Sequence, residues 1–283
     1  MITVREVIKK TTEHHLLYNN GLLYAQCVRA VGWIGGTVPE LTEEQGIVEL
    51  PTSDVSNGGI VCGSALAGRR PIYVIRYQGF VTYNMCSILN YAAKSKEMWD
   101  VPCPVFVRGI GMEGGIGPVA TGMHHSAMMR FPGIKVFAPM TPFEWKTVWN
   151  EYLDGDDPVY CSEHRLSFDN NQEIGDVVTG SCNTVVVIGP ARLNLDQIKQ
   201  EYSDYNIINL YQLKPLQLSN EQAGVIADSD YVVIIDSDYS ICGASEHVAY
   251  TIMRNYDTYC HIVALEDKTA GFAKHCDNIT RIK

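Results

Sequence analysis

Residues 49–76 read ELPTSDVSNGGIVCGSALAGRRPIYVIR. The middle of this stretch consists mainly of Gly, Ala, Ser, Val and Ile, and predicts a helix that can lie very close to another backbone. The run IYVIR that follows it is apolar and β-rich, and predicts a strand. A helix leading directly into a buried strand is the repeating unit of α/β folds, so this stretch indicates the fold class.

Similar strand patterns recur along the whole chain, between helical or turn-rich stretches. They begin at residues 72, 104, 134 and 158, and again at residues 184, 205, 231 and 261. This alternation predicts parallel strands joined by crossover helices. The polar, turn-rich stretch after His164, RLSFDNNQEIGDVVTGSCN, is predicted to be a linker. We therefore expect two open, parallel-sheet α/β domains, residues 1–170 and 183–283, with a boundary near residue 175.

Composition excludes several classes of protein. The chain has 283 residues and 46% hydrophobic content, enough for a sizeable core and for two domains. No apolar run approaches the roughly 18 residues of a membrane span, and the N-terminus lacks a secretory pattern, so we expect a cytoplasmic protein without membrane contact. A net charge of −10 without a basic block argues against nucleic acid as a partner.

The cysteines indicate packing and not a metal site. There are nine of them, and no two form a C-x-x-C pair. Cys62, Cys86, Cys103 and Cys182 stand among apolar or small residues, as reduced core thiols do. We expect no metal bound by this chain.

Ligands of open α/β sheets bind at the carboxyl ends of the strands, which directs attention to residues 76–80, 108–123 and 236–243. The loop RGIGMEGGIGPVATGMHHS, residues 108–126, is rich in glycine and ends in His124 and His125. It is either a flexible surface loop or a ligand loop, and the imidazoles favour the second because histidine transfers protons near neutral pH. The chain has neither GxxxxGK[ST] nor a GxGxxG between strand and helix, so we expect no phosphate loop here.

Asp54 stands at the mouth of the small-residue helix, and the local sequence leaves two interpretations open. Ser53 and Asp54 suit a helix N-cap, which is the purely structural interpretation. The alternative is a functional carboxylate aimed at a ligand. The rest of the chain has to decide between them.

Taken together, several segments resemble the beta subunits of thiamine-diphosphate-dependent 2-oxo acid dehydrogenases of the pyruvate, branched-chain and acetoin types. The C-terminal half of transketolases is more distantly similar. The resemblance covers nearly the whole chain, and it implies a pyrimidine-binding domain followed by a transketolase C-terminal-like domain. It rests on TVREVI, LPTSD, GIVCGSALAGRRP, GFVTYNMCSILNYAAK, VPCPVFVRG with the glycine loop to HHS, FPGIKVFAPMTP, DDPVYCSEH, the connecting strand in LYQLKPL, and DSDYSICGASEHVA.

The resemblance implies roles for four residues. Asp54 falls where the family has a Glu that gives a proton to a ring nitrogen of the cofactor's aminopyrimidine, so it is the expected catalytic and cofactor-binding carboxylate, one methylene shorter. Phe80 falls where an aromatic ring lies against the aminopyrimidine; otherwise it is a core residue. His125, in HHS where the family has QHS, is the expected active-site histidine that orients or protonates the substrate-derived intermediate. His124 is a further candidate for substrate contact.

Two departures from the family pattern concern the substrate. Arg76 occupies a cofactor-pocket position that is usually apolar, and it either pairs with Asp54 or binds an anionic group of the substrate; we expect the second. Tyr24, Ala25 and Gln26 stand where the family has a GED-like stretch.

The family's diphosphate motif, GDG followed by NN, is missing; only Asp154-Gly155-Asp156 occurs, before a predicted strand. The resemblance therefore implies thiamine diphosphate whose magnesium is held mainly by a separate alpha-type subunit, in an α2β2 assembly. The expected reaction decarboxylates a 2-oxo acid and transfers the acyl or aldehyde fragment. The alternatives are the C-terminal subunit of a split transketolase acting on a ketose phosphate, and a non-catalytic structural subunit. The substrate, a lipoyl carrier protein and potassium binding are left open.

Overall fold

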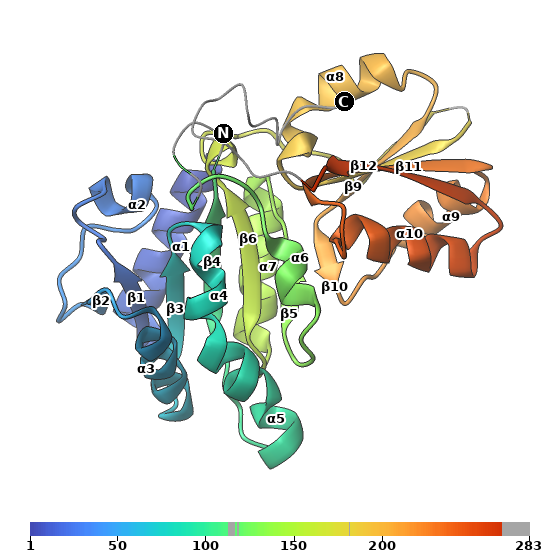
Figure 1. The fold of residues 1–283 in the computed structure, drawn as a ribbon. Helices are drawn as coiled ribbons and strands as arrows, with labels where there is room; N and C mark the ends of the chain where they lie inside the picture. The colour runs from blue at the N-terminus through green and yellow to red at the C-terminus, as the bar shows by residue number, and fades with distance from the viewer. Residues whose placement is uncertain (113–116, 118, 181, 268–283) are drawn as a thin grey trace.

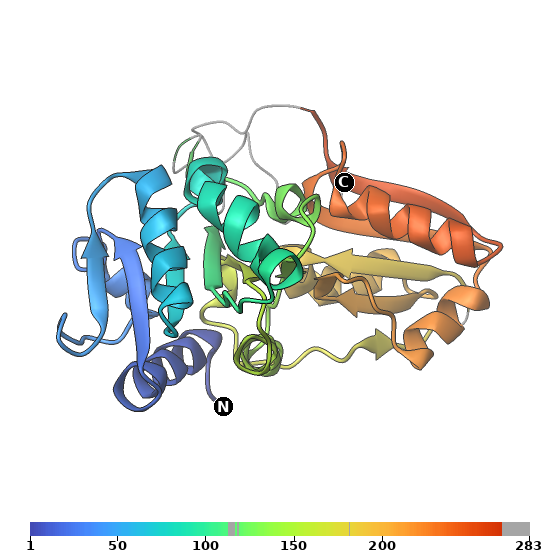
Figure 2. The same cartoon turned by 90° about the horizontal axis from the view of Figure 1, so that it is seen from below.

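The computed structural model describes residues 1–112, 117, 119–180 and 182–267 (Figure 1). Two sheets dominate it, one of seven strands in the order β10-β5-β6-β4-β3-β1-β2 and one of five in the order β12-β11-β8-β9-β7. Helices cover the faces of both sheets (Figure 2). The predicted fold class, two open and mainly parallel α/β sheets, is confirmed.

The first sheet contains the four strands predicted in the first half of the chain. All of its neighbouring strands pair in parallel except β10, which pairs antiparallel with β5. Its strands are β1 (Gly21–Gln26), β2 (Ile47–Leu50), β3 (Arg70–Ile75), β4 (Phe106–Gly111), β5 (Lys135–Phe137), β6 (Val159–His164) and β10 (Gln212–Lys214). The sequence patterns missed β1 and β2, which lie at one edge.

Helices pack on both faces of this sheet because its strands alternate between two cores. On β3, Ile72 and Val74 face one core while Tyr73 and Ile75 face the other. One face is covered by α1 (Val4–Tyr18) and α7 (Pro142–Asp154); the other is covered by α3 (Asp54–Leu66), the π-helix η2 (Ile88–Ala92), α5 (Ala93–Trp99) and α6 (His125–Met129). Shorter elements are α2 (Gly32–Gly36), η1 (Gln78–Phe80) and α4 (Val81–Asn84).

The small residues of α3 do bring two backbones together, as predicted. A Cβ atom on Gly58 would lie 2.5 Å from the carbonyl oxygen of Asn84 in α4, closer than real Cβ atoms approach a backbone oxygen. Gly58 is therefore required for the contact between α3 and α4, whichever ligand the neighbouring residues bind.

The second sheet contains the four strands predicted in the second half. It has one antiparallel pair, β7 with β9. Its strands are β7 (Val177–Val178), β8 (Thr184–Ile188), β9 (Asn206–Leu210), β11 (Tyr231–Tyr239) and β12 (Tyr259–Leu265). One face carries η4 (Gly189–Asn194) and α8 (Leu195–Glu201); the other carries α9 (Asn220–Ala227) and α10 (Ala244–Asn255).

One connection differs from the prediction of a plain linker, and a second agrees with the connecting strand that the resemblance implies. The stretch after His164 contains η3 (Arg165–Ser167) and β7, and its carbonyls at Phe168 and Asn170 accept the N–H groups of Arg5 and Val4. The stretch LYQLKPL contains β10, which returns from the second half of the chain to the edge of the first sheet. The connecting strand implied by the resemblance is thus present. The first sheet therefore contains a strand from the second half of the chain, so the two sheets are not joined by a simple linker alone.

A buried ion pair joins the two halves of the molecule. Arg192 of η4 reaches Glu144 of α7, and the Nη1–Oε2 distance is 3.0 Å. Both side chains are almost fully buried. Glu144 also accepts the backbone N–H of Thr141 and so closes the capping box of α7, which fixes the carboxylate before the arginine meets it.

The cysteine prediction is partly wrong. The eight described cysteines are free thiols, and Cys62 and Cys103 are buried as expected, but Cys86 and Cys182 are exposed. Apolar neighbours in the sequence did not reveal which face of a helix or turn these two side chains occupy. None of the helices in the described part of the chain is long and apolar enough to cross a membrane.

Candidate functional site

Asp54 is the first residue of α3 and lies at the carboxyl end of the parallel strands β1 and β2. The N-cap position belongs to Ser53, whose side chain makes no capping hydrogen bond. Asp54 instead accepts a hydrogen bond at Oδ1 from Nε2 of Gln26, at 2.6 Å. It is half-buried, and no described residue donates a hydrogen bond to its Oδ2. The carboxylate is therefore held on one side and open on the other.

A chain of buried polar contacts connects the surroundings of Asp54 to Phe80. Burial raises the pKa of Tyr73, and the nearby carboxylate of Asp54 raises it further, so the tyrosine keeps its proton. The hydroxyl of Tyr73 donates to Oδ1 of Asn84. The amide of Asn84 in turn donates to the carbonyl oxygen of Phe80 at 3.0 Å. The backbone of Phe80 is thereby tied to Tyr73 of β3, and the half-buried ring of Phe80 packs against Tyr77 with ring centroids 5.9 Å apart.

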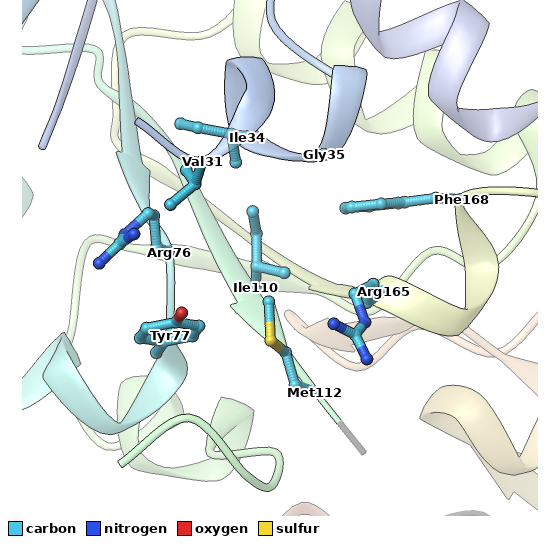
Figure 3. Close-up of a pocket in the computed structure, with 9 residues that line it drawn as sticks. All are labelled: Val31, Ile34, Gly35, Arg76, Tyr77, Ile110, Met112, Arg165 and Phe168. Atoms are coloured by element: carbon cyan, nitrogen blue, oxygen red, sulfur yellow. The ribbon is translucent and has the colours of Figure 1, made fainter. Parts of the chain in front are cut away.

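Arg76 lies at the end of β3 and lines a pocket of about 210 Å³ (Figure 3). Arg165 lines the pocket as well. The other lining residues are mainly apolar: Val31, Ile34, Gly35, Tyr77, Ile110, Met112 and Phe168. The guanidinium of Arg76 stacks on the ring of Tyr77, with 4.9 Å to the ring centroid. It forms no ion pair within the described ranges, so it does not neutralise Asp54.

His125 is fully buried at the start of α6, against the second sheet. Its Nε2 lies 3.2 Å from Oδ1 of Asp236 and 3.8 Å from Oδ2 of Asp238, both on β11. Burial alone would lower the pKa of His125, but the carboxylates of Asp236 and Asp238 outweigh it and raise that pKa to about 8. The imidazolium is the form that this site stabilises near neutral pH, and it joins the two halves of the chain.

His124 has the opposite environment. It lines a pocket of about 430 Å³ between the two sheets, together with Ser126, Arg130, Asp238 and Tyr239. Its ring stacks on that of Tyr239, with 6.0 Å between the centroids and 6° between the planes. Burial lowers the pKa of His124, and the neighbouring His125 adds to this, while Asp238 acts against it. His124 is therefore the neutral imidazole of the pair and the one that faces open space.

Gln78 holds the segment of Arg76 and Phe80 against the loop of the two histidines. Its Oε1 accepts the backbone N–H of His124 at 2.6 Å, and its Nε2 donates to the carbonyl of Gly109 at 3.0 Å and to Oγ of Ser162 at 2.8 Å. Gln78 is fully buried. This role could not be predicted, because a glutamine two residues before Phe80 belongs to no motif.

Gln26 is the second residue whose role the sequence motifs do not reveal. In the sequence it stands only as a departure from the GED-like stretch, yet it is the hydrogen-bond partner of Asp54. It is the last residue of β1, a strand that the apolar patterns do not predict, so the sequence offers no signal for it.

Other predicted positions lie elsewhere. Arg108, expected just after a strand, is inside β4 and forms a buried ion pair with Glu163, with Nε–Oε1 at 2.8 Å. Asp236 is likewise inside β11. Asp154 ends α7 and Asp156 follows it in a turn, where Lys96 lies 3.6 Å from Oδ2 of Asp156. Gly114 and Gly115 of the glycine loop lie outside the described residues.

The structure gathers Asp54, Gln26, Arg76 and Phe80 at one end of the first sheet, and Gln78 connects them to His124. His125 shares this end but points into the second half of the chain. The described residues contain no group of three or more His, Cys, Asp or Glu side chains that could hold a metal ion. One carboxylate oxygen of Asp54 is open and the ring of Phe80 is only half-buried, so both side chains can still contact a ligand.

The chain is similar to known proteins over most of its length. Residues 11–169 match the family model of the transketolase pyrimidine-binding domain. Pyruvate dehydrogenase E1 component subunit beta of Rickettsia felis is 22% identical over 306 residues, covering 98% of this chain and 93% of that protein. Acetoin:2,6-dichlorophenolindophenol oxidoreductase subunit beta of Cupriavidus necator is 23% identical, covering 78% and 71%. A split-gene transketolase, solved as an inactive beta4 tetramer, covers 94% of this chain with a TM-score of 0.69 and 18% identity.

Proposed function

The chain belongs to the transketolase pyrimidine-binding domain family, and on that premise we propose that it is the beta-type subunit of a thiamine-diphosphate-dependent enzyme. The reaction cleaves a carbon–carbon bond beside the carbonyl of a 2-oxo acid and passes on the acyl or aldehyde fragment. The observation that carries the proposal is Asp54, held at Oδ1 by Gln26 and open at Oδ2, beside the segment of Phe80. Residues 1–170 are the proposed pyrimidine-binding domain, and residues 183–283 the proposed transketolase C-terminal-like domain.

The residues present fit the aminopyrimidine half of the cofactor. Asp54 offers the carboxylate that exchanges a proton with a ring nitrogen, and Phe80 offers a flat apolar face for the ring. When bound, thiamine diphosphate supplies the nucleophilic carbon that attacks the substrate carbonyl. Gln26 holds the shorter aspartate in place, which matters because a displacement of roughly 1 Å in a fixed site can cost about a hundredfold in rate.

Arg76 and His124 are the proposed substrate contacts. Arg76 places a permanent positive charge at the edge of a mainly apolar pocket, stacked on Tyr77, an arrangement that suits the carboxylate of a 2-oxo acid with a short apolar chain. His124 faces open space as a neutral imidazole and can accept or return a proton. His125, enclosed by Asp236 and Asp238, stays charged and positions its neighbour.

The proposal includes a separate partner. The chain carries no GDG motif with the NN that follows it in the family, so an alpha-type subunit must hold the diphosphate and its magnesium, in an α2β2 assembly. Calorimetry tests this directly. We expect the chain alone to bind thiamine diphosphate and magnesium weakly, and an alpha-type chain with both motifs to restore tight binding. Micromolar binding by the isolated chain would refute the division of the site.

The C-terminal subunit of a split transketolase is the second candidate, favoured by the fold similarity to the split-gene transketolase. Arg76 would then meet the phosphate of a ketose phosphate. The donor distinguishes the two candidates: release of carbon dioxide from 2-oxo acids supports the first, and formation of an aldose from a ketose phosphate supports the second. If the complex binds the cofactor but consumes neither donor, the remaining interpretation is a non-catalytic structural subunit.

A further inference from the structure

Cys62 and Cys103 lie next to each other, although 41 residues separate them in the sequence. Cys62 is on the buried face of α3, and Cys103 precedes β4. The thiol of Cys103 donates to the carbonyl oxygen of Cys62 at 3.8 Å, and the two side chains are close enough for each thiol to shift the pKa of the other. Two thiols in such contact form a unit whose chemistry differs from that of a single buried cysteine.

An apolar groove of about 460 Å³ reaches this pair from the surface. Gly63 and Leu66 of α3 form one wall, Tyr91 of η2 and Trp99 of α5 form the other, and both cysteines line it. Leu66, Tyr91 and Trp99 are more than half exposed, so the groove opens to solvent in this chain. Small molecules therefore have a path to two thiols that are otherwise buried.

The two sulfurs are not equivalent. The hydrogen bond from Cys62 lowers the pKa of Cys103, against the effect of burial. The contact with Cys103, and then burial, raise the pKa of Cys62. Cys103 is thus the thiol that ionises first, while Cys62 keeps its proton. A thiolate next to a proton-bearing thiol is the arrangement of a nucleophilic and a resolving cysteine.

We propose that Cys62 and Cys103 form a dithiol modification site that small hydroperoxides oxidise to a disulfide. The sulfur of Cys103 attacks one peroxide oxygen, the O–O bond breaks, water or an alcohol leaves, and Cys103 becomes a sulfenic acid. The sulfur of Cys62 then attacks the sulfur of Cys103, the S–O bond breaks, and water leaves with the proton of Cys62. The two thiols lose two electrons, and the peroxide takes up both.

This modification acts on the helix that carries Asp54. Cys62 lies eight residues, about two turns, after Asp54 on α3. A disulfide bond of about 2 Å is shorter than the contact between two unbonded sulfurs, so its formation pulls α3 toward the segment before β4. The proposal rests on the contact between the two cysteines and on the groove that reaches them, and it does not depend on the reaction proposed above.

The test is peptide mapping of the full chain after treatment with hydrogen peroxide and blocking of the remaining thiols. We expect a disulfide-linked pair of peptides that contain Cys62 and Cys103, reversed by a dithiol reductant. Exposed Cys86 is the internal reference, because its oxidation shows that the peroxide was sufficient. A chain in which Cys86 is oxidised while Cys62 and Cys103 remain reduced would overturn the proposal. The mapping uses the unsubstituted chain and so does not depend on the folding of any variant.

Variants then test the order of the two steps. Cys62→Ser should stop the sequence at Cys103 sulfenic acid, which dimedone traps, and Cys103→Ser should give neither the link nor trapped sulfenic acid at Cys62. Cys86→Ser is the matched control and should form the link like the parent chain. Dimedone on Cys62 in Cys103→Ser, with none on Cys103 in Cys62→Ser, would contradict the assignment of Cys103 as the nucleophile.

Discussion

Asp54 and His125 begin two helices at the same end of the first sheet, yet their surroundings are opposite. Asp54 is half-buried, with one neutral amide as its hydrogen-bond partner and one open oxygen. His125 is fully buried in the interface between the sheets, with Asp236 and Asp238 beside it. The open group is equipped to exchange a proton with a ligand, and the enclosed group is equipped to hold the two halves together.

The difference shows that burial and partners, and not residue type alone, assign the roles at this end of the sheet. Both groups occupy positions that the family resemblance gives to catalysis. In this structure the imidazole of His125 is buried against two carboxylates. The ring of its neighbour His124 lines a pocket and is the accessible one. Substitutions in the interface around His125 should therefore change the stability of the fold. Substitutions at Asp54 and Arg76 should change binding and proton exchange instead.

The interface between the two halves of the chain should lose the most stability when the buried ion pair of Arg192 and Glu144 is broken. Arg192→Ala leaves Glu144 as an unpaired buried carboxylate between the two halves. We expect the free energy of unfolding to fall by about 3–5 kcal/mol, measured by urea denaturation. Lys9→Ala is the matched control, because its pair with Glu40 is at the surface and its loss should cost no more than about 1 kcal/mol. Equal losses in the two variants would remove the distinction between the interface and the surface.

The charge of His125 should make the interface sensitive to pH. Its pKa rises from 6.5 to about 8 in the folded chain. Protonated His125 therefore stabilises the fold fully below about pH 6.5, and this contribution of about 2 kcal/mol is lost as the pH rises through about 8. The facing groups are Asp236, Asp238 and His124, of which the two carboxylates hold the charge.

Unfolding curves at several pH values between about 6 and 9 measure this loss. The stability difference between the parent and His125→Gln should shrink as the pH rises. A difference that stays constant for His125→Gln would mean that the imidazole is neutral in the interface.

On the open side, Arg76→Met tests recognition of the substrate. Loss of the guanidinium should raise KM for an anionic donor by about tenfold or more in the reconstituted complex, because a hydrogen-bonded charge contributes roughly 1.5–3 kcal/mol. Proton exchange on the cofactor should not change. Arg29→Met is the matched control, since Arg29 stacks on Trp33 as Arg76 stacks on Tyr77 but does not line the pocket. Faster cofactor exchange with unaltered KM would contradict a substrate contact.

The smallest expected effect compares two helix starts. Thr141→Ala removes the capping bond of α7 on the enclosed side and should cost about 1 kcal/mol. Ser53→Ala at the start of α3 should change stability by less than about 0.5 kcal/mol, because Ser53 makes no capping bond. Thermal unfolding of both variants measures the contrast. A loss at Ser53 as large as that at Thr141 would restore the capping interpretation of residues 53 and 54.

Much of the fold could be predicted from the sequence because the strands are apolar and parallel. The eight predicted strands are all present, since buried parallel strands appear as short apolar runs. The edge strands β7 and β10 were harder to recognise, because two or three residues give no periodicity. The return of β10 to the first sheet is a tertiary pairing, and only the family resemblance indicated it.

The candidate site was predictable in its motif residues and not in their partners. The family resemblance, and the departures from it, singled out Asp54, Arg76, Phe80 and the two histidines. Gln26 and Gln78 act through side-chain hydrogen bonds to groups that are distant in sequence, so no local pattern reveals them. The enclosure of His125 depends on Asp236 and Asp238, more than 100 residues away, and became visible only with both sheets in place.

The central claim is that Asp54 is the carboxylate that activates the cofactor, and proton exchange at the reactive carbon of the thiazolium ring tests it most directly. The measurement uses the chain reconstituted with an alpha-type subunit, and circular dichroism confirms that each variant is folded. We predict that Asp54→Asn and Asp54→Ala lower the exchange rate by about a hundredfold or more, whereas Asp54→Glu retains or raises it. Asp169→Asn, at an exposed carboxylate, should leave the rate unchanged. Exchange at the parent rate in both neutral Asp54 variants, with the cofactor bound, would contradict the account.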